Sequence, residues 1–438
     1  MEPLELAYNL ILNTAGYGVL PYLWSKAKDD PIFMEGRLGG FDLPPSIEKR
    51  PRLWFHAASV GEVTGAIPTL HAAHSRLPHA AIFLSVATLQ GFRFAKKQLP
   101  GWTHVLPFPL DFPWVIKRAF NQLQPDLYVT FESEFWPNLY RFLERKGVPA
   151  VLLNGRISSR SARRYRNLKP LFQPVFERFR WLAMHSEEDR RNILTLGVPA
   201  EKTVVLGSSK YDGLSLRARP EKTHQWRGIL SLPEDIPVVV AGSLRRSECL
   251  ELMEVFQALR KIDERVVGIF VPRHLEQIPN MVQWLQEREI PFQLLSHIEA
   301  GEEKRRCCVV LVDRIGILFE LYALGDLIFC GGTLEPIGGH NILEPAAWKK
   351  PVFYGPHLQK VPDEHRILQA LKGSFPVHDD QDLQQQWSYW IRHLSELKPH
   401  GEMAGKALET LGGVAAKQVE LLVSALPPET LKPLASGH

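Results

Sequence analysis

The 438-residue sequence has few cysteines and lacks the common metal and phosphate motifs. Its four cysteines show no CxxC spacing, which argues against a zinc finger or a disulfide framework and indicates free thiols in a reducing compartment. No P-loop, HExxH or EF-hand pattern occurs. The formal net charge is only +4, too small by itself to indicate nucleic acid as a partner.

Long uninterrupted apolar runs are also lacking. The most apolar stretch, Leu4 to Trp24, contains a glutamate, two asparagines, two glycines and a proline, and no basic leader or small-residue cleavage site marks a signal peptide. A spanning helix needs about 20 predominantly apolar residues, so this stretch is marginal. Aromatic and basic residues in and after it favour a helix lying on a membrane surface; they are Tyr8, Tyr17, Tyr22, Trp24, Lys26 and Lys28. The alternative is a helix packed on its own domain.

Short apolar runs alternate with amphipathic stretches along most of the chain, which predicts parallel strands joined by helices. The first series of expected strands is LWFHAA, AIFLSVA, HVLPFPL, DLYVTFE, AVLLNG, WLAMHS and TVVLGS. The second series is PVVVAGS, VVGIFVP, CCVVLVD, DLIFCGG and KPVFYG. We therefore expect two doubly wound Rossmann-like domains.

The predicted boundaries follow from these series and from a charged stretch between them, SLRARPEKTHQWRG. We expect a membrane-associating segment over 1–30, an acceptor domain over 31–214, a linker over 215–228 and a donor domain over 229–438. The last helix could pack back on the first domain. Ligands of open parallel sheets bind outside the carboxyl ends of the strands, so the expected site is a cleft between the domains.

Glu62 follows the first expected strand in the sequence HAASVGEV. The spacing from Ser59 to Glu62 is that of a capping box, in which the glutamate only closes a helix start. A carboxylate at the carboxyl end of a strand could also accept a proton from a substrate hydroxyl. The helix N-terminus would keep it ionised.

Glu132 and Glu134 flank a serine where the strand DLYVTFE ends. In an extended chain they would point to the same side of the sheet, where a carboxylate can stabilise a developing oxocarbenium ion. Surface ion pairs with nearby arginines are the alternative.

A basic run without acidic residues follows the next expected strand. It reads NGRISSRSARRYRNLK and contains Arg156, Arg160, Arg163, Arg164, Arg166 and Lys169. A solvated basic face is the usual explanation of such a run. Because arginine binds phosphate and carboxylate in bidentate geometry, a phosphorylated lipid headgroup is an equally reasonable partner.

Three loops of the second half follow strands. Gly242 and Ser243 would let the backbone approach a ligand, and Arg273 after VVGIFVP could hold a phosphate. The third loop, CGGTLEPIGGHNILEP, contains Gly331, Gly332, Gly338 and Gly339. Pro345 fits only the first turn of a helix, so we expect a helix to begin near Asn341 and to form a nucleotide-phosphate site with the loop amides. Glu344 could accept ribose hydroxyls.

These elements together resemble the Kdo transferases, from about Trp54 to Pro356. The resemblance is carried by HAASVGE, ESEFWPN, NGRISSRSARRY, GSSKYD, VPRH and GGHNILEP in this order. Members of that family transfer 3-deoxy-D-manno-octulosonic acid (Kdo) from CMP-Kdo to the lipid A precursor of lipopolysaccharide. The resemblance implies a GT-B fold, inversion at the anomeric carbon, no metal or other cofactor, and an N-terminal anchor at the cytoplasmic face of the inner membrane.

The resemblance also implies roles for individual residues. Glu62 matches the general base, and Glu132 and Lys210 match residues that stabilise the transition state. The matched CMP site comprises Pro272, Arg273, Ile315, Gly316, Ile317, Asn341, Ile342, Leu343 and Glu344.

Two positions depart from the family pattern. Ile317 stands where a D-x-x-G-E-L motif has glutamate, so only a backbone contact is expected there, and this form is typical of the chlamydial branch. Ser208 replaces an asparagine in the motif around Lys210. Two other functions fit part of the pattern: a GT-B-shaped sugar-nucleotide epimerase, and a non-catalytic protein that binds anionic lipid through the basic run.

Overall fold

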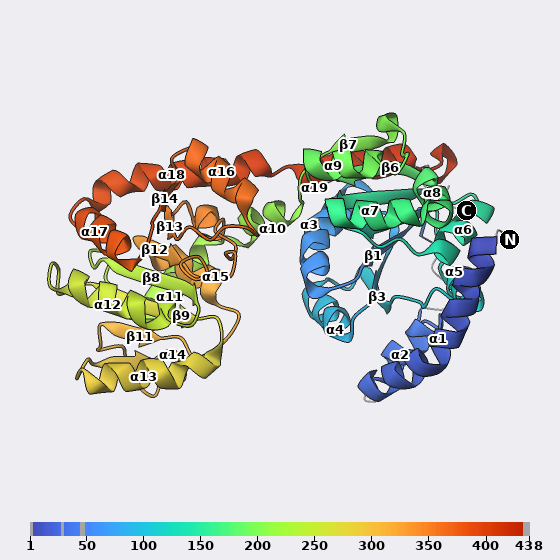
Figure 1. Cartoon of the computed structure of the whole chain (residues 1–438). Helices are drawn as coiled ribbons and strands as arrows, with labels where there is room; N and C mark the ends of the chain where they lie inside the picture. Colours follow the sequence, from blue (N-terminus) through green and yellow to red (C-terminus); the bar gives the residue numbers. More distant parts are fainter. Residues whose placement is uncertain (1–2, 28–29, 44–48, 432–438) are drawn as a thin grey trace, which may run out of the picture. The chain divides into compact units, whose positions relative to one another are not determined.

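Two seven-stranded parallel sheets dominate the computed structural model, which describes residues 3–27, 30–43 and 49–431 (Figure 1). The chain contacts divide it into a first unit, residues 1–213 and 411–438, and a second unit, residues 214–410. In Figure 1 helices cover both faces of each sheet. The predicted pair of doubly wound α/β domains is therefore confirmed.

The sheet of the first unit has the strand order β3-β2-β1-β4-β5-β6-β7. Its strands are β1 (Arg52–Ala57), β2 (Ala81–Val86), β3 (Thr103–Pro107), β4 (Leu127–Phe131), β5 (Ala150–Gly155), β6 (Phe179–Met184) and β7 (Thr203–Val205). Its helices are α1 (Pro3–Ala27), α2 (Pro31–Arg37), α3 (Val60–Arg76), α4 (Leu89–Gln98), α5 (Pro113–Leu123), α6 (Pro137–Arg145), α7 (Ser159–Asn167), α8 (Lys169–Glu177), α9 (Glu187–Leu194), α19 (Val414–Ala425) and the 3-10 turns η1 (Ala200–Lys202) and η5 (Pro428–Leu431).

The sheet of the second unit has the order β10-β11-β9-β8-β12-β13-β14. Its strands are β8 (Val238–Leu244), β9 (Val267–Pro272), β10 (Phe292–Leu294), β11 (Val309–Leu311), β12 (Leu327–Cys330), β13 (Val352–Tyr354) and β14 (Ser374–Pro376). Its helices are α11 (Pro220–Ile229), α12 (Glu248–Arg260), α13 (Ile278–Glu287), α14 (Leu295–Glu299), α15 (Leu318–Leu321), α16 (Pro362–Ala370), α17 (Asp380–Trp390), α18 (Leu394–Leu411) and the 3-10 turns η2 (Leu275–Gln277), η3 (Tyr322–Leu324) and η4 (Pro345–Trp348).

Both sheets have a topological switch point at the centre. In the first sheet β1 lies between β2 and β4, and in the second β8 lies between β9 and β12. The chain crosses over in opposite directions on the two sides of such a strand, which leaves a crevice at its carboxyl end. The candidate residues of each unit are therefore expected after β1 and β4 or after β8 and β12.

The strands are apolar on both faces because helices cover both. In β1, Leu53 and Phe55 pack with α3, α4 and α19, whereas Trp54 packs with α5, α6 and α8 on the opposite face. Continuous burial of this kind is typical of parallel sheets. It explains why each expected strand reads as a run of apolar residues and not as an alternating pattern.

The stretch 215–228, which we expected to be a linker, is largely helical. It contains the end of α10 (Lys210–Arg217) and most of α11. Pro220 stands in the first turn of α11, and Trp226 is buried and donates its indole N–H to Glu320 (2.7 Å). The many charged residues of this stretch led us to predict a linker, and the one buried residue that fixes the helix, Trp226, was overlooked.

The assignment of 229–438 to the donor domain allowed its last helix to pack back on the first domain, and residues 411–438 do belong to the first unit. Figure 1 shows the red helix α19 beside α3, and the two helices are in contact. The buried amide of Gln418 donates to Asn154 (2.8 Å) and its oxygen accepts from Thr69 (2.6 Å). These bonds hold α19 against β5 and α3.

Helix α1 packs on the first unit through polar contacts. The Tyr8 hydroxyl donates to buried Asp111 (2.8 Å), and Asn9 bonds to Asn138. On other sides of the helix Leu4, Leu6, Leu10 and Ile11 are exposed, Leu10 to 66%. Within the described chain no helix has both the length and the apolar content to cross a bilayer. Outside the description lie Lys28 and the side chains of Tyr17, Tyr22, Trp24 and Lys26.

Candidate active site

Glu62 lies in the first turn of α3, directly beyond the carboxyl end of β1. Ser59 caps the helix by accepting the Glu62 N–H through its hydroxyl oxygen (3.4 Å). The Glu62 carboxylate accepts the backbone N–H of Ala58 (2.8 Å) and lies 3.3 Å from the Ser59 hydroxyl. The predicted capping arrangement is confirmed, although the backbone donor is Ala58 and not Ser59.

The Glu62 carboxyl has an unusual proton affinity. Burial and, to a smaller extent, the nearby charges of Glu132 and Glu134 together raise its pKa to about 7, against the lowering effect of the Ala58 and Ser59 hydrogen bonds. The three carboxylates therefore lie close enough to influence one another. A carboxyl group that titrates near neutral pH is suited to proton transfer.

Glu132 follows β4 and has a left-handed backbone, with φ of 59°. Its N–H donates to Leu153 (3.0 Å) and its carbonyl accepts from Arg156 (3.3 Å), so the loop after β5 holds this conformation. Such a conformation is uncommon for a residue with a side chain, and residues held in it concentrate at functional sites. Burial raises the pKa of the Glu132 carboxyl, while Arg156 and Lys210 lower it. The predicted pair Glu132 and Lys210 therefore shares one site.

Lys210 begins α10, and its ammonium group lies 4.7 Å from the centre of the Tyr211 ring. Ser208, the residue that departs from the family pattern, is buried and accepts the Lys210 N–H through its hydroxyl oxygen (3.4 Å). The departure thus leaves a side chain that still fixes the backbone at the start of α10.

Glu134 is influenced by two residues that the sequence did not single out, His56 and Arg37. Although burial by itself raises the pKa of the Glu134 carboxyl, contacts with His56 and Trp136 and the nearby charge of Arg37 lower it below its usual range. The buried His56 ring donates from Nδ1 to the carbonyl of Ser85 (3.0 Å) and turns Nε2 toward Glu134 (3.7 Å). The signal that could have identified His56 is its position in β1, one residue before the end of the buried run Leu53–Ala57.

The basic run divides into two parts. The guanidinium of Arg156 donates to His185 (3.0 Å) and lies near Glu132, so this arginine belongs to the carboxylate cluster. The others lie on or beside α7, are exposed and form no ion pair with a described residue; they are Arg160, Arg163, Arg164, Arg166 and Lys169. They form an exposed basic face, which fits either interpretation of the run.

In the second unit, the glycine loop after β12 does not present the amides we predicted. The buried carboxylate of Glu248 accepts the N–H groups of Gly332 (2.7 Å), Thr333 (3.0 Å) and Leu334 (2.9 Å), and also that of Arg245 (2.9 Å). A carboxylate from the start of α12 thus occupies the place expected for a phosphate. The prediction that this part of the loop binds a phosphate through its amides is wrong.

The helix predicted near Asn341 is also shorter than expected. Residues 342–344 form a turn, and Pro345–Trp348 form only a four-residue 3-10 helix, since the side chain of Asn341 takes the N–H of Leu343 (3.3 Å). A helix dipole is therefore not available. The N–H groups of His340, Asn341 and Ile342 donate to no acceptor in the described chain, and His340 and Asn341 are partly exposed, whereas Ile342 is fully buried.

Glu344 and Arg273 lie close together, as the predicted CMP site requires. Burial raises the pKa of the Glu344 carboxyl, and Arg217 and Arg273 lower it. Pro272 ends β9, and the N–H of Arg273 donates to Leu244 (2.8 Å) while its side chain is exposed. Ile342 and Leu343 are fully buried, so the structure does not expose these two predicted positions to a ligand.

Positive charge gathers around His340, next in sequence to Asn341. Burial and, after it, the charges of Arg245, Arg273, Lys360 and His274 together lower the pKa of this imidazole to about 4. Sequence reasoning missed Arg245 and Lys360, which come from the loop after β8 and from the loop before α16. The arrangement provides a binding region for an anion.

The loop 315–317 presents its predicted residues in different ways. Ile315 is 78% exposed, Gly316 has φ of 100°, and Ile317 is only 6% exposed. The Ile317 carbonyl accepts the N–H groups of Glu320 and Leu321 at the start of α15. Ile317 therefore packs its side chain in the core, which accounts for an apolar residue at this position.

Two further features of the described residues bear on ligands. They contain no group of three or more His, Cys, Asp or Glu side chains that could hold a metal ion.

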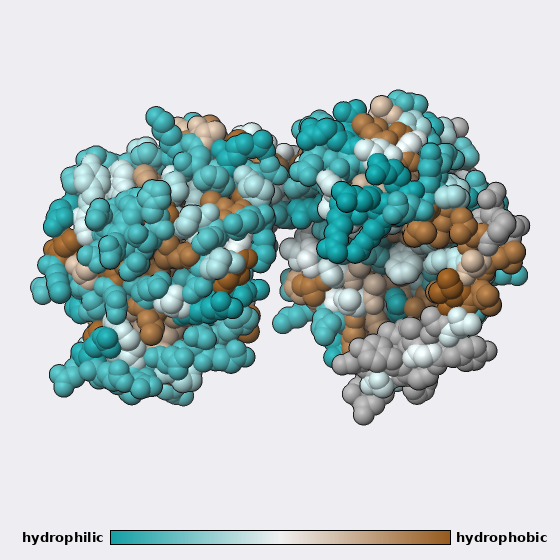
Figure 2. Space-filling model, viewed as in Figure 1, coloured by the Kyte–Doolittle hydropathy of each residue, from teal (hydrophilic) through white to brown (hydrophobic). Residues whose placement is uncertain are grey.

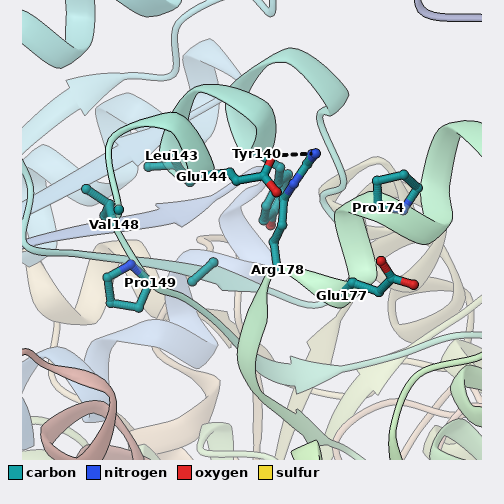
Figure 3. A pocket seen from close by; sticks show the side chains of 10 residues that line it. Tyr140, Leu143, Glu144, Val148, Pro149, Pro174, Glu177 and Arg178 are labelled. Carbon is teal, nitrogen blue, oxygen red and sulfur yellow. Dashed lines mark ion pairs between the residues drawn. The ribbon is translucent and has the colours of Figure 1, made fainter. Parts of the chain in front are cut away.

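A pocket of about 320 Å³ lies at the amino end of β5, where Glu144 points toward Arg178 in an ion pair of 2.7 Å (Figure 3). It contains none of the candidate residues.

Comparisons with known proteins agree with the geometry. A family model described as 3-deoxy-D-manno-octulosonic-acid transferase matches residues 34–213. A 3-deoxy-D-manno-octulosonic acid transferase of Chlamydia pneumoniae is 36% identical over 310 residues, 70% of this chain and 70% of that protein. The protein of the same name from Haemophilus influenzae is 32% identical over 331 residues, 75% of this chain and 76% of the other.

A solved structure shares the two-unit fold. UDP-GlcNAc 2-epimerase of Neisseria meningitidis superposes with a TM-score of 0.57 over 85% of this chain and 99% of the other, at 12% sequence identity. At that identity the likeness concerns the fold alone, and it supports the predicted GT-B class.

Proposed function

The chain belongs to the 3-deoxy-D-manno-octulosonic acid transferase family of lipopolysaccharide biosynthesis, and from this premise we propose that it transfers Kdo from CMP-Kdo to the lipid A precursor lipid IVA with inversion. Glu62 is the proposed general base. The observation that carries this assignment is the cluster of Glu62, Glu132 and Glu134 beyond β1 and β4, in which the pKa of the Glu62 carboxyl is about 7. An ordinary exposed glutamate would be a weaker base at neutral pH.

In the proposed reaction, a sugar hydroxyl of lipid IVA loses its proton to the Glu62 carboxylate. Its oxygen forms a bond to the anomeric carbon of Kdo on the face opposite the phosphate. The bond from that carbon to the phosphate oxygen breaks, and CMP leaves with the electron pair. Glu132 stabilises the positive charge that develops on the sugar, and Arg156 and Lys210 favour its ionised form against burial, which raises the pKa of its carboxyl.

CMP is proposed to bind the second unit through the anion-binding region. Arg273 attracts the phosphate, and the unpaired N–H groups of the partly exposed His340 and Asn341 supply hydrogen bonds. Glu344, near Arg217 and Arg273, accepts the ribose hydroxyls. The proposal requires no metal, because cationic side chains surround the leaving phosphate.

Attachment to the cytoplasmic face of the inner membrane is the proposed localisation. The exposed Leu4, Leu6, Leu10 and Ile11 give α1 an apolar side that can enter the headgroup boundary. The exposed arginines of α7 would interact with anionic lipid or with the phosphates of lipid IVA. In Figure 2, hydrophilic residues cover most of the visible surface, and hydrophobic residues gather in smaller areas.

The test is transfer by the full chain and by its Glu62→Gln variant. Glutamine preserves the capping geometry, since its oxygen can accept the Ala58 N–H, but it cannot take a proton. The rate of Kdo transfer from CMP-Kdo to lipid IVA is measured by mass spectrometry of the product. In the Glu62→Gln variant we expect this rate to fall by roughly 10²- to 10⁴-fold, while CMP binding is retained.

Glu187→Gln is the matched control, since this glutamate also stands in the first turn of a helix, is exposed, and should leave transfer unchanged. Near wild-type transfer by Glu62→Gln would refute the base assignment and leave only the capping role. The product mass also counts the Kdo residues added. Release of a free epimerised sugar nucleotide would instead support the epimerase, and lipid binding without CMP release would support the non-catalytic alternative.

A further inference from the structure

The contact between Arg245 and His340 determines which imidazole nitrogen carries the proton. The Nε–H of Arg245 donates to Nε2 of His340 over 3.1 Å. An arginine guanidinium stays protonated in proteins and cannot accept a hydrogen bond. Nε2 must therefore present its lone pair, and the proton of the neutral ring lies on Nδ1.

The surroundings oppose a second proton on this ring. Arg245, Arg273, Lys360 and His274 all act on His340 in the direction that favours the neutral form, in addition to burial, and its pKa is about 4. At neutral pH His340 is therefore a neutral donor within a cationic group of side chains.

Buried Glu248 holds the backbone of Arg245 and the loop on which the His340 ring packs. It accepts the backbone N–H of Arg245 (2.9 Å) and that of Gly332 (2.7 Å). Gly332 has φ of 70°, and a Cβ there would lie 2.8 Å from Cδ2 of the His340 ring. The ring thus packs directly on the loop that Glu248 fixes, and its orientation follows from this support.

The remaining ring nitrogen is available to a ligand. His340 is half-buried, and its Nδ1 has no acceptor among the residues that the structure describes. The backbone N–H groups of His340, Asn341 and Ile342 are likewise unused within the described chain. These donors stand close together in sequence, beside the side chains of Arg273 and Lys360.

We infer that His340 is a phosphate-binding residue, a neutral imidazole of fixed tautomer that donates Nδ1–H to a phosphate oxygen of the donor substrate, and that Arg245 is the residue that positions it. This inference rests on the proposed function, since it takes CMP-Kdo as the donor. Because cationic side chains surround it, the neutral ring donates a hydrogen bond but does not transfer a proton to the leaving group. CMP therefore departs unprotonated at this site, and its charge is held by Arg273 and Lys360.

The test measures CMP binding to the full chain by calorimetry. His340→Phe keeps a planar ring but removes the donor, and we expect the affinity for CMP to fall roughly 10- to 100-fold, the range for a hydrogen bond to a charged group. His378→Phe, at an exposed histidine of the same unit, is the matched control and should bind as the wild type does. Hydrogen exchange of the second unit establishes that both variants are folded.

Arg245→Gln separates positioning from mere support of the fold. Without this cation the pKa of His340 rises from about 4 toward its ordinary value of 6.5, while burial and the other cations still lower it, so a larger fraction of the ring is protonated at pH 5.5 than in the wild type. We expect the ratio of CMP affinity at pH 5.5 to that at pH 7.5 to increase relative to the wild type. The nitrogen-15 signals of His340 in the wild type should show a neutral, Nδ1-protonated ring at pH 7.

Three results would overturn the inference: an Nε2-protonated ring, wild-type CMP affinity in His340→Phe, or an unchanged affinity ratio in Arg245→Gln. Failure of the proposed function gives a different result, because the wild-type chain would then not bind CMP or would not transfer Kdo. Wild-type binding together with unaffected variants refutes only the role of His340.

Discussion

The two units have the same kind of sheet but opposite charge beyond their central strands. Glu62, Glu132 and Glu134 gather after β1 and β4, and the first of these has its pKa raised to about 7. His340 lies among cations in the second unit, and its pKa is lowered to about 4. The same doubly wound scaffold thus supports a proton acceptor in one unit and anion binding in the other. Loop residues, and not the fold, set the chemistry.

Both units also use a buried carboxylate to organise backbone N–H groups. Glu248 of the second unit accepts four of them, whereas Asp111 of the first unit accepts those of Asn138 and Leu139 and the hydroxyl of Tyr8. Buried charges of this kind are stable only when they are fully hydrogen-bonded. The difference is that one donor to Asp111 comes from a distant helix, α1.

The largest effect is expected from Glu248→Gln. Each carboxylate oxygen accepts two of the four N–H groups, so replacing one oxygen by NH₂ leaves two donors without an acceptor, at about 1–3 kcal/mol each. We expect the free energy of unfolding of the second unit to fall by roughly 2–4 kcal/mol. CMP affinity should fall at least about tenfold, since the loop supports His340.

Denaturant titration and hydrogen exchange of the loop after β12 measure the first effect, and calorimetry measures the second. Glu254→Gln is the control, as this residue lies exposed on the same helix, α12. Unchanged stability in Glu248→Gln would show that the loop amides do not depend on this carboxylate, and the contrast between the two units would lose its basis.

An intermediate effect is expected from Glu134→Gln, which tests whether the charge of Glu134 raises the pKa of Glu62. The charge of Glu134 raises the pKa of Glu62, so its removal should move the acid limb of the pH–rate profile below pH 7, toward the ordinary glutamate value of 4.5. Transfer requires deprotonated Glu62, and the variant should retain a larger share of its maximum at pH 6 than the wild type does. Glu144→Gln, at a half-exposed residue of the same unit, should leave the limb in place.

The contribution of Glu62 to the free energy of unfolding decreases as the pH rises, whereas the transfer rate increases. Because the pKa of Glu62 is higher in the folded chain than the ordinary 4.5, folding binds a proton between about pH 4.5 and 7. Its contribution to stability is complete below this window and is lost as the pH rises through 7. An acid limb that stays near pH 7 in Glu134→Gln would contradict the proposed coupling.

Most of the fold could be predicted from buried apolar runs. DLYVTFE, for example, contains β4, and VVGIFVP contains β9. The strands β10 and β14 were missed because each has only three residues at a sheet edge and lacks such a run. Edge strands have fewer buried positions, and their sequence signal is correspondingly weak.

The candidate site was predictable only where a residue directly follows a strand. Glu62 and Arg273 were identified in this way. Glu248 was missed because it meets Gly332 and Thr333 across 84 and 85 residues of sequence. The glycines indicated a loop with free N–H groups, but a sequence does not show which distant side chain accepts hydrogen bonds from them. We therefore predicted a phosphate where the structure has the carboxylate of Glu248.

The smallest effect is expected from Tyr8→Phe, which tests the link between α1 and the first unit. Burial raises the pKa of the Asp111 carboxyl to about 7, while its hydrogen bonds, including that from the Tyr8 hydroxyl, lower it. The bond therefore favours the ionised form, and its loss should cost about 1 kcal/mol at pH 8. At pH 5.5 Asp111 is mostly protonated, and the loss should be smaller.

Denaturant titration at both pH values measures this difference in the free energy of unfolding. Tyr389→Phe, at a tyrosine that is 51% exposed, is the control and should have no effect at either pH. An equal loss at pH 5.5 and pH 8 would mean that Tyr8 contributes through packing alone. A loss confined to pH 8 would show that ionised Asp111 holds α1 on the first unit. Glu248 has no such role in the second unit, because its four donors all come from the loops after β8 and β12.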